Sequence, residues 1–210
     1  HSLLKGKSMK LYYSPGACSL ASHIALLEAG IPFIADKVDM RTRQTSDGRD
    51  FTTVNPNGYV PALEIDDGEV LSEGQAILQY LADQKPAAKL APPAGTMPRY
   101  RLIEWLSFIS SELHKGFGPL LRPGGAEDVK AAARDKLGVR LTYVAKHLAS
   151  RQYLVGEHFT VADAYLYTIL TWTRIAGIDL SAWPVLAAYR ERVQQRPAVQ
   201  AARQAEGLKA

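Results

Sequence analysis

A proline-rich break divides this chain into two parts with different secondary-structure patterns. Residues 86–98 contain four prolines and a glycine. Proline lacks a backbone donor and its ring clashes with the preceding turn, so such a stretch cannot continue a helix and suits a linker. We therefore expect a first domain at residues 9–87, a linker at 88–98 and a second domain at 99–210.

The first part alternates short apolar runs with helical patterns. Strand-like runs predict strands at residues 10–13, 33–38, 61–65 and 69–71. Helical periodicity predicts helices at residues 19–29 and 73–84. A loop and a short helix lie between the second and third strands. The turn Asp66-Asp67-Gly68 predicts a tight hairpin between the last two strands. The resulting order β-α-β-α-β-β-α, which ends in an antiparallel pair, resembles thioredoxin.

Nearly all of the second part has helical periodicity. We expect an all-α bundle with helices at residues 97–117, 126–149, 161–176, 184–195 and 198–206. Thr160 and Asp163 have the spacing of a capping box, in which each side chain bonds the backbone amide of the other residue. We give this pair a structural role.

Composition and charge limit the classes of function. The chain has 210 residues, a formal net charge of +4 and a pI near 9.1, and its basic residues are dispersed along helices beside acids. Nucleic-acid-binding proteins concentrate basic residues in a patch, so we do not expect a nucleic-acid partner. No apolar run predicts a membrane span or a membrane partner.

The cysteine content and the first residues suggest a compartment. With one cysteine the chain cannot form an internal disulfide, which favours a reducing environment. The opening HSLLKGKS lacks the pattern of a signal peptide. We expect a cytoplasmic protein and interpret residues 1–8 as a terminal extension or an expression remnant.

The single cysteine, Cys18, lies where an expected strand gives way to an expected helix, after the turn Ser14-Pro15-Gly16. Unpaired amides and the positive end of the helix dipole stabilise an anion there, and thiols in such positions often titrate well below about 8.5. This position predicts a reactive sulfur. Free cysteine is also among the most buried residue types, so a small core residue is the alternative.

Two strand junctions offer binding groups. Pro61 at the start of a strand leaves the backbone of Val60 outside the local ladder, and a cis bond between them would let Val60 pair with an extended peptide. An ordinary trans turn proline is the alternative. At the next junction, the Gly74 amide can receive a carboxylate and Glu73 can face an ammonium. The alternative is that Ser72 simply caps the helix.

The first long helix of the second part carries a polar stripe. Ser107, Ser111 and His114 are spaced i, i+4 and i+7, which places them on one face of a regular helix. Lys115 follows directly. Near Cys18, the histidine and lysine would add positive field and stabilise a thiolate. A histidine with only a structural role is the alternative.

Five segments together resemble cytosolic glutathione transferases, and their details resemble the bacterial beta class. They are MKLYYSPGACSLASHIAL, NPNGYVPAL, LSEGQAILQYLAD, IEWLSFISSELHKGF and HFTVADAYLYT. The resemblance covers nearly the whole chain from Met9. It implies an α/β thioredoxin-like N-terminal domain, an all-α C-terminal helical bundle, and a homodimer with its ligand between the two domains.

The resemblance also assigns roles around the glutathione sulfur. Cys18 matches the cysteine that contacts this sulfur and can form a mixed disulfide with it. His114 and Lys115 match the basic pair that faces the sulfur. The backbone at Val60 and Pro61 matches the group that pairs with the cysteinyl unit.

The rest of glutathione is matched by residues on other elements. Glu73 and Gly74 match the γ-glutamyl site, and Ser111 matches a polar contact from the long helix. Arg43 stands where a lysine is common and keeps the charge for the glycyl carboxylate. Ser107 stands where an asparagine is common, and its shorter side chain weakens the expectation of a direct contact.

The implied activity is that of a transferase with glutathione as co-substrate, acting on hydrophobic electrophiles in detoxification and needing no metal. Two alternatives remain open. Thiol–disulfide exchange or reductive dehalogenation would be the main reaction if the cysteine at the sulfur site acts covalently. A non-catalytic binding protein on the same scaffold is the third hypothesis, and the intact set of ligand residues argues against it.

Overall fold

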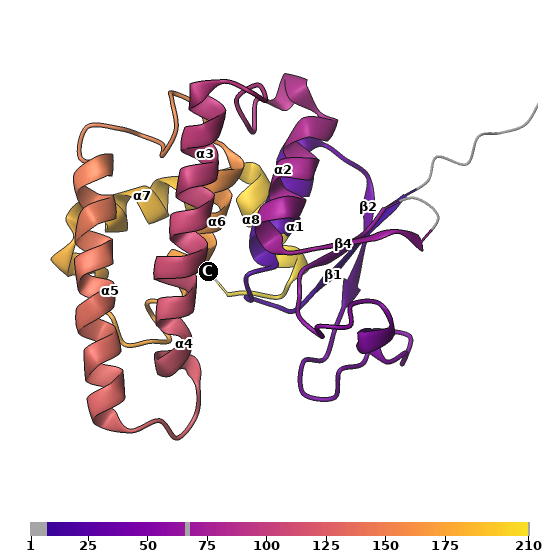
Figure 1. Cartoon of the computed structure of the whole chain (residues 1–210), viewed down its shortest axis with the longest axis horizontal. Coiled ribbons are helices and arrows are strands. Elements are labelled where there is room, and N and C mark those ends of the chain that lie inside the picture. Colours follow the sequence, from indigo (N-terminus) through magenta and orange to yellow (C-terminus); the bar gives the residue numbers. More distant parts are fainter. Residues whose placement is uncertain (1–7, 66–67, 210) are drawn as a thin grey trace, which may run out of the picture.

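The computed structural model describes residues 8–65 and 68–209 (Figure 1). Within them, four strands form one sheet in the order β2-β1-β3-β4. The strands are β1 (Met9–Tyr13), β2 (Phe33–Lys37), β3 (Ala62–Glu64) and β4 (Val70–Ser72). β1 pairs parallel with β2 and antiparallel with β3, which pairs antiparallel with β4. The thioredoxin-like order and the hairpin pairing are confirmed, while Asp66 and Asp67 of the predicted turn lie outside the described residues.

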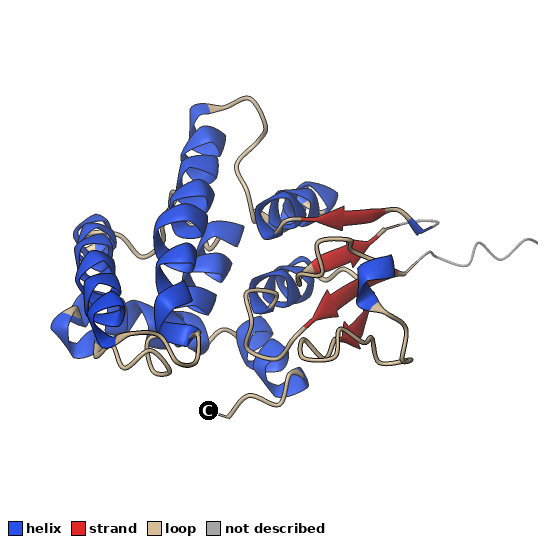
Figure 2. Cartoon of the chain, turned by 60° about the horizontal axis from the view of Figure 1, so that its bottom comes forward, coloured by secondary structure: helices blue, strands red, loops and turns tan. Residues whose placement is uncertain are grey.

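Two helices cover one face of the sheet. They are α1 (Leu20–Ala29), which crosses over between the parallel strands, and α2 (Gly74–Gln84). Figure 2 shows both between the sheet and the remaining helices. α1 ends at Gly30, whose φ of 63° is the left-handed conformation that glycine adopts most readily.

Alternation along β1 divides the apolar side chains between the two faces of the sheet. Leu11 and Tyr13 belong to the main core. Tyr12 points to the other face and packs in a smaller cluster with Phe51, which lies in the short 3₁₀ helix Phe51–Thr53. This is the two-residue period of a strand that is covered on both faces.

The second part is all helical, as predicted. Its helices are α3 (Met97–Phe108), α4 (Lys115–Leu121), α5 (Glu127–Leu148), α6 (Val161–Thr171), α7 (Pro184–Gln194) and α8 (Pro197–Ala205). Short 3₁₀ helices occupy Pro86–Ala88 and Leu180–Ala182. A π-helical segment, Ile109–His114, joins α3 to α4. None of the helices in the described residues is long and apolar enough to cross a membrane.

The prediction for α6 is too long at its C-terminal end, because the helix stops at Thr171 rather than at residue 176. The hydroxyls of Thr171 and Thr173 donate to the carbonyls of Thr168 and Leu170 at 2.6 and 2.7 Å. These bonds satisfy the last carbonyls without another helical turn. The apolar spacing of the segment could not reveal this local competition.

Hydrogen bonds of Trp172 and Glu206 connect the helical part to the loop before α1 and to α1 itself. The Trp172 indole donates to the Gly16 carbonyl at 2.8 Å, and the Gly16 amide donates to a Glu206 carboxylate oxygen at 2.9 Å. The other oxygen of Glu206 lies 2.8 Å from Nδ1 of buried His23 on α1. Both polar groups of Gly16 are therefore held by residues more than 150 positions away along the chain.

The predicted capping box at the start of α6 is confirmed. Asp163 is fully buried and also accepts bonds from the Leu154 amide at 3.0 Å and the Tyr189 hydroxyl at 2.7 Å. Burial raises the pKa of this carboxyl to about 6, although the surrounding donors lower it. Asp163 therefore caps α6 and also connects α6 to α7 and to the loop before α6.

We expect Asp163→Ala to lower the free energy of unfolding by about 3 kcal/mol or more. The substitution leaves several buried donors without an acceptor, and each unsatisfied donor costs about 1–3 kcal/mol. Urea unfolding followed by circular dichroism measures this change. Asp128→Ala, which removes an exposed aspartate in the first turn of α5, is the matched control and should change stability by about 0.5 kcal/mol or less. Equal effects of the two substitutions would contradict the structural role of Asp163.

Candidate active site

A cleft of about 390 Å³ lies between the first part and the helical part. Seven of the ten predicted site residues line it: Cys18, Val60, Pro61, Glu73, Gly74, His114 and Lys115. They come from the loop before α1, the start of β3, the start of α2 and the junction of the π-helical segment with α4. The fold therefore brings together residues that are almost a hundred positions apart.

Cys18 lies just before α1, as predicted, but its sulfur is not an activated thiolate. The backbone amides of Cys18 and Ser19 lower the pKa of the thiol, and Lys115 lowers it slightly. Burial outweighs them and raises the pKa to about 11. The expectation of a depressed pKa is corrected: desolvation wins over the helix terminus, and Cys18 is a thiol at neutral pH.

The thiol is therefore a hydrogen-bond donor, and it donates to the Val60 carbonyl at 3.3 Å. The Val60-Pro61 peptide bond is cis, the condition that the sequence left open. This contact places the Cys18 sulfur directly beside the backbone that was predicted to bind an extended peptide.

Glu73 and Gly74 line the cleft at the start of α2. Glu73 has a φ of 68°, which is unusual for a non-glycine residue, and it occupies the position before α2 without any side-chain cap on the helix. The alternative of Ser72 as the cap is therefore wrong. The amides of the first turn of α2 lack a side-chain acceptor, and the Glu73 carboxylate is exposed beside them.

His114 is neutral at neutral pH. Burial and the neighbouring charge of Lys115 lower the pKa of its imidazole to about 4. Its Nδ1 lies 2.6 Å from the Tyr165 hydroxyl, whose own pKa is raised by burial, and Ser110 also bonds this hydroxyl. If Ser110 donates to Tyr165 and Tyr165 donates to Nδ1, the remaining proton of His114 is on Nε2.

This protonation state corrects the prediction of a cationic pair. His114 supplies a neutral N–H donor, while Lys115 supplies the positive charge on the same wall of the cleft. Together with the Cys18 thiol, the cleft offers several donors to a bound anion and one negatively charged lining residue, Glu73. Such a site can hold a small acidic molecule with its sulfur or oxygen ionised.

Three predicted residues do not line the cleft. Ser107 and Ser111 are exposed, and the Ser111 hydroxyl donates to the Ser107 carbonyl at 2.9 Å. The stripe prediction assumed a regular α-helix, whereas the π-helical segment changes the angle between successive residues. As a result Ser110, one position before Ser111, lines the cleft instead.

Arg43 also lies outside the lining but borders it. Its guanidinium donates to the Gly58 carbonyl at 2.6 Å and lies 6.0 Å from the ring centre of Tyr59, which lines the cleft. Arg43 has a φ of 59°, so its backbone adopts a conformation that is uncommon without glycine.

Sequence reasoning missed other lining residues, above all Tyr165 and Arg122. Tyr165 reads as a core residue of an apolar helix, and it is indeed buried, but its hydroxyl reaches His114. The exposed Arg122 lies directly after α4 and resembles any solvated arginine in sequence. In the sequence, only the spacing between Lys115 and Arg122, about two helical turns, indicates that the two side chains lie on the same side of a helix.

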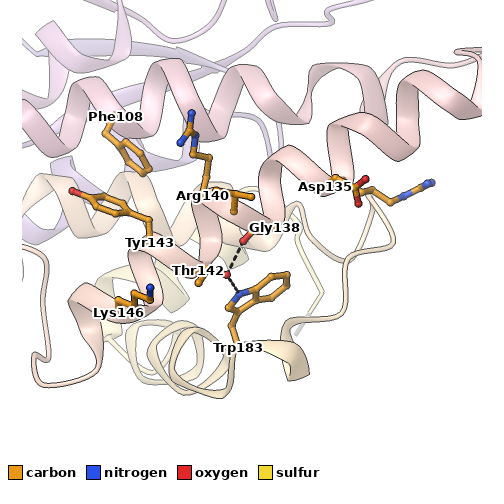
Figure 3. Close-up of a pocket in the computed structure, with 10 residues that line it drawn as sticks. Phe108, Asp135, Gly138, Arg140, Thr142, Tyr143, Lys146 and Trp183 are labelled. Carbon is orange, nitrogen blue, oxygen red and sulfur yellow. Dashed lines mark hydrogen bonds between the residues drawn. The ribbon is translucent and has the colours of Figure 1, made fainter.

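A separate hollow of about 790 Å³ lies on the outer side of α5 and contains none of the predicted site residues (Figure 3). Trp183 donates to the Thr142 hydroxyl at 2.9 Å, and Tyr143 packs on Phe108 with ring centres 5.1 Å apart. These contacts join α5 to its neighbours. Elsewhere in the described part of the chain, no three His, Cys, Asp or Glu side chains converge as a metal site.

A thioredoxin-like sheet joined to a helical bundle, with a cysteine and a cis-proline strand in the cleft between them, defines the glutathione transferase class of protein. Family comparison agrees with the fold. Residues 16–84 match the glutathione S-transferase N-terminal domain, and residues 108–197 match the glutathione S-transferase C-terminal domain.

Whole-chain relatives extend this match. The glutathione S-transferase GstA of Escherichia coli O157:H7 is 48% identical over 201 residues, covering 96% of this chain and all of that protein. A bacterial beta class glutathione S-transferase of Sphingomonas chungbukensis is 54% identical with a TM-score of 0.92, over 95% of this chain and 100% of that one. A sphingomonad glutathione S-transferase complexed with glutathione has 53% identity, a TM-score of 0.92 and the same coverage.

The chain therefore belongs to the glutathione S-transferase family, and its relatives place it with the bacterial beta class. The predicted family and fold are both confirmed.

We expect the His114 imidazole to titrate near pH 4 rather than near the usual 6.5, because burial and Lys115 oppose its protonation. Proton–carbon NMR spectra of the histidine side chains between pH 3.5 and 8 measure this, with His114→Asn to assign the signal. Because the folded pKa lies below the unfolded value, this group takes stability away as the pH falls from about 6.5 to about 4. A midpoint above pH 6 would contradict the neutral donor.

Proposed function

We propose that this cleft binds glutathione as co-substrate and transfers its thiolate to electrophilic small molecules. The observation that carries the proposal is the meeting of the Cys18 thiol, the Val60 backbone, the start of α2 and His114 on one cleft. Family membership and a glutathione complex of a close structural relative support it.

Each part of the tripeptide has a chemically matched group. The Val60 backbone suits the cysteinyl amide, because an extended peptide bonds exposed strand backbone. The uncapped amides at the start of α2 suit the γ-glutamyl carboxylate, and the exposed Glu73 carboxylate suits its ammonium. Arg43, beside Tyr59 at the edge of the cleft, suits the glycyl carboxylate.

In this proposal, hydrogen-bond donors of the cleft stabilise the ionised glutathione thiol, and no side chain of the protein acts as a general base. When glutathione binds, the Cys18 S–H would turn from the Val60 carbonyl to the glutathione sulfur. The S–H, the nearby backbone amides and the His114 N–H would then share the negative charge of that sulfur, and Lys115 would add an attractive field. These groups lower the pKa of the bound thiol, so that glutathione itself supplies the nucleophile. The thiolate attacks an electrophilic carbon, and the leaving group departs with its bonding electrons.

The raised pKa of Cys18 argues against the first alternative, in which this residue acts covalently. A thiol with a pKa of about 11 is almost entirely protonated at pH 7 and is a slow partner in disulfide exchange. Conjugation is therefore proposed as the main reaction. The intact set of cleft residues argues against a purely binding role.

We further propose a homodimer in the cytoplasm that detoxifies hydrophobic electrophiles. Large apolar side chains are exposed on three helices of the bundle: Met97, Tyr100, Leu121, Val129, Val139 and Tyr143. Covering several of them against a second copy of the chain would remove apolar surface from water. The dispersed charges support neither a nucleic-acid nor a membrane partner.

Cys18→Ala and Cys18→Ser separate donor chemistry from covalent chemistry. We expect Cys18→Ala to lower the rate of glutathione conjugation to 1-chloro-2,4-dinitrobenzene by about tenfold, which corresponds to about 1.4 kcal/mol for one lost donor. Cys18→Ser keeps an O–H donor and should retain most of the rate. Any mixed disulfide that the wild-type protein slowly forms with oxidised glutathione should be absent from both variants, which intact mass spectrometry measures.

Thermal melts of the variants control for folding. Complete loss of conjugation in both variants would contradict the proposal, because it would make the Cys18 sulfur indispensable. Retention of disulfide exchange in both variants would show that glutathione alone performs that reaction.

A further inference from the structure

Two cations line the cleft at opposite ends of α4, Lys115 at its first residue and Arg122 directly after its last. Lys115 and Arg122 both line the cleft, and Gly118, which lies between them along the helix, lines it as well. Spacings of three and four residues place all three on the same side of a helix. A side-chain carbon added at Gly118 would meet nothing within 4 Å, so the wall of the cleft is open at this position.

These two cations are not neutralised by the protein. Within residues 8–65 and 68–209, neither side chain takes part in an ion pair. Six other arginines form ion pairs: Arg49, Arg99, Arg101, Arg134, Arg140 and Arg196. Arg122 is distinguished from the remaining unpaired arginines by lining the cleft. The exposed position of Arg122 at the cleft therefore leaves its guanidinium available to a ligand.

The acidic groups that face the cleft do not offset this charge. Glu73 is the one carboxylate among the lining residues, and it stands at the start of α2, where the proposed γ-glutamyl ammonium would meet it. Arg43 at the opposite edge is the proposed partner of the glycyl carboxylate. After glutathione has bound with its thiolate facing Lys115, the guanidinium of Arg122 would still be an unmatched positive charge at the cleft.

We propose that Arg122, beside the open position at Gly118, forms an anion-binding acceptor subsite, and that this enzyme prefers electrophiles carrying a carboxylate or sulfonate. This inference rests on the proposed glutathione conjugation and names its substrate class. A fork-shaped guanidinium binds such groups through two donors, and a cationic wall concentrates anions in the cleft. Arg122 would act as a specificity-determining residue and not as part of the thiol-activating machinery.

Two acceptors of nearly the same shape test the preference: 4-chloro-3,5-dinitrobenzoate, which is an anion, and the neutral 4-chloro-3,5-dinitrobenzamide. In both, the glutathione thiolate forms a carbon–sulfur bond at the chlorinated carbon, chloride leaves with the bonding electrons, and the thiol proton passes to water. Dividing each kcat/KM by the uncatalysed rate with glutathione removes the difference in intrinsic reactivity. The ratio of the two corrected values, anion over neutral, is the charge preference.

We expect the full-length wild-type protein to favour the benzoate, and Arg122→Gln to reduce the charge preference by about fivefold, the size expected for one partly exposed charge pair. Arg122→Lys should keep most of the preference. Arg151→Gln removes an exposed arginine outside the cleft and is the matched control, with no change expected. Raising the salt concentration to 0.5 M should weaken the wild-type preference through screening.

The KM for glutathione should stay within about twofold in Arg122→Gln, because Arg122 is assigned to the acceptor. A higher KM for glutathione with both acceptors slowed equally would overturn the inference and assign Arg122 to the glycyl carboxylate. An unchanged charge preference would overturn it as well. No conjugation of either compound by the wild-type protein would instead overturn the proposed function, and the acceptor subsite with it.

Discussion

The active-site loop of this protein is held in place from outside its own domain. Gly16 donates its amide to Glu206 and accepts the Trp172 indole at its carbonyl, so this loop residue before Cys18 is fixed by the C-terminal ends of α6 and α8. His23 on α1 binds the same carboxylate. Trp172 also packs edge-on against His114, with ring centres 5.0 Å apart. The sulfur and the histidine therefore depend on the same junction between the two parts.

Burial at this junction decides the protonation states of the site. The same loss of water that raises the pKa of Cys18 to about 11 lowers that of His114 to about 4. Both groups are neutral at pH 7, and both become hydrogen-bond donors instead of charges. A bound thiolate would then be the species that these donors favour, with Lys115 as the nearby cation. This explains how a half-buried cysteine and a half-buried histidine can serve a reaction that neither performs covalently.

The sequence was most informative where local chemistry determines the structure. The proline-rich break, the hairpin pairing and the capping box at Thr160 and Asp163 all follow from turn, cap and period rules. Placing Cys18, Val60 and His114 in one cleft needed the family resemblance, because their contact is set by tertiary packing. The protonation of Cys18 and His114 could not be foreseen, since burial is not visible along the chain. Ser110 replaced Ser111 because a π-helical turn has no clear sequence signature.

The central claim is that the cleft ionises the thiol of glutathione while the thiol of the protein stays protonated. Ultraviolet difference spectra of the thiolate, recorded from pH 5 to 9, below the ionisation of the ten tyrosines, with and without bound glutathione, test it directly because the chain has one cysteine. The account predicts that bound glutathione titrates at least one pH unit below the free value of about 8.5, and that the protein alone shows no thiolate transition up to pH 9, because the pKa of the Cys18 thiol is raised to about 11. A transition of the protein alone below pH 8, or a bound glutathione thiol that titrates like the free one, would contradict it.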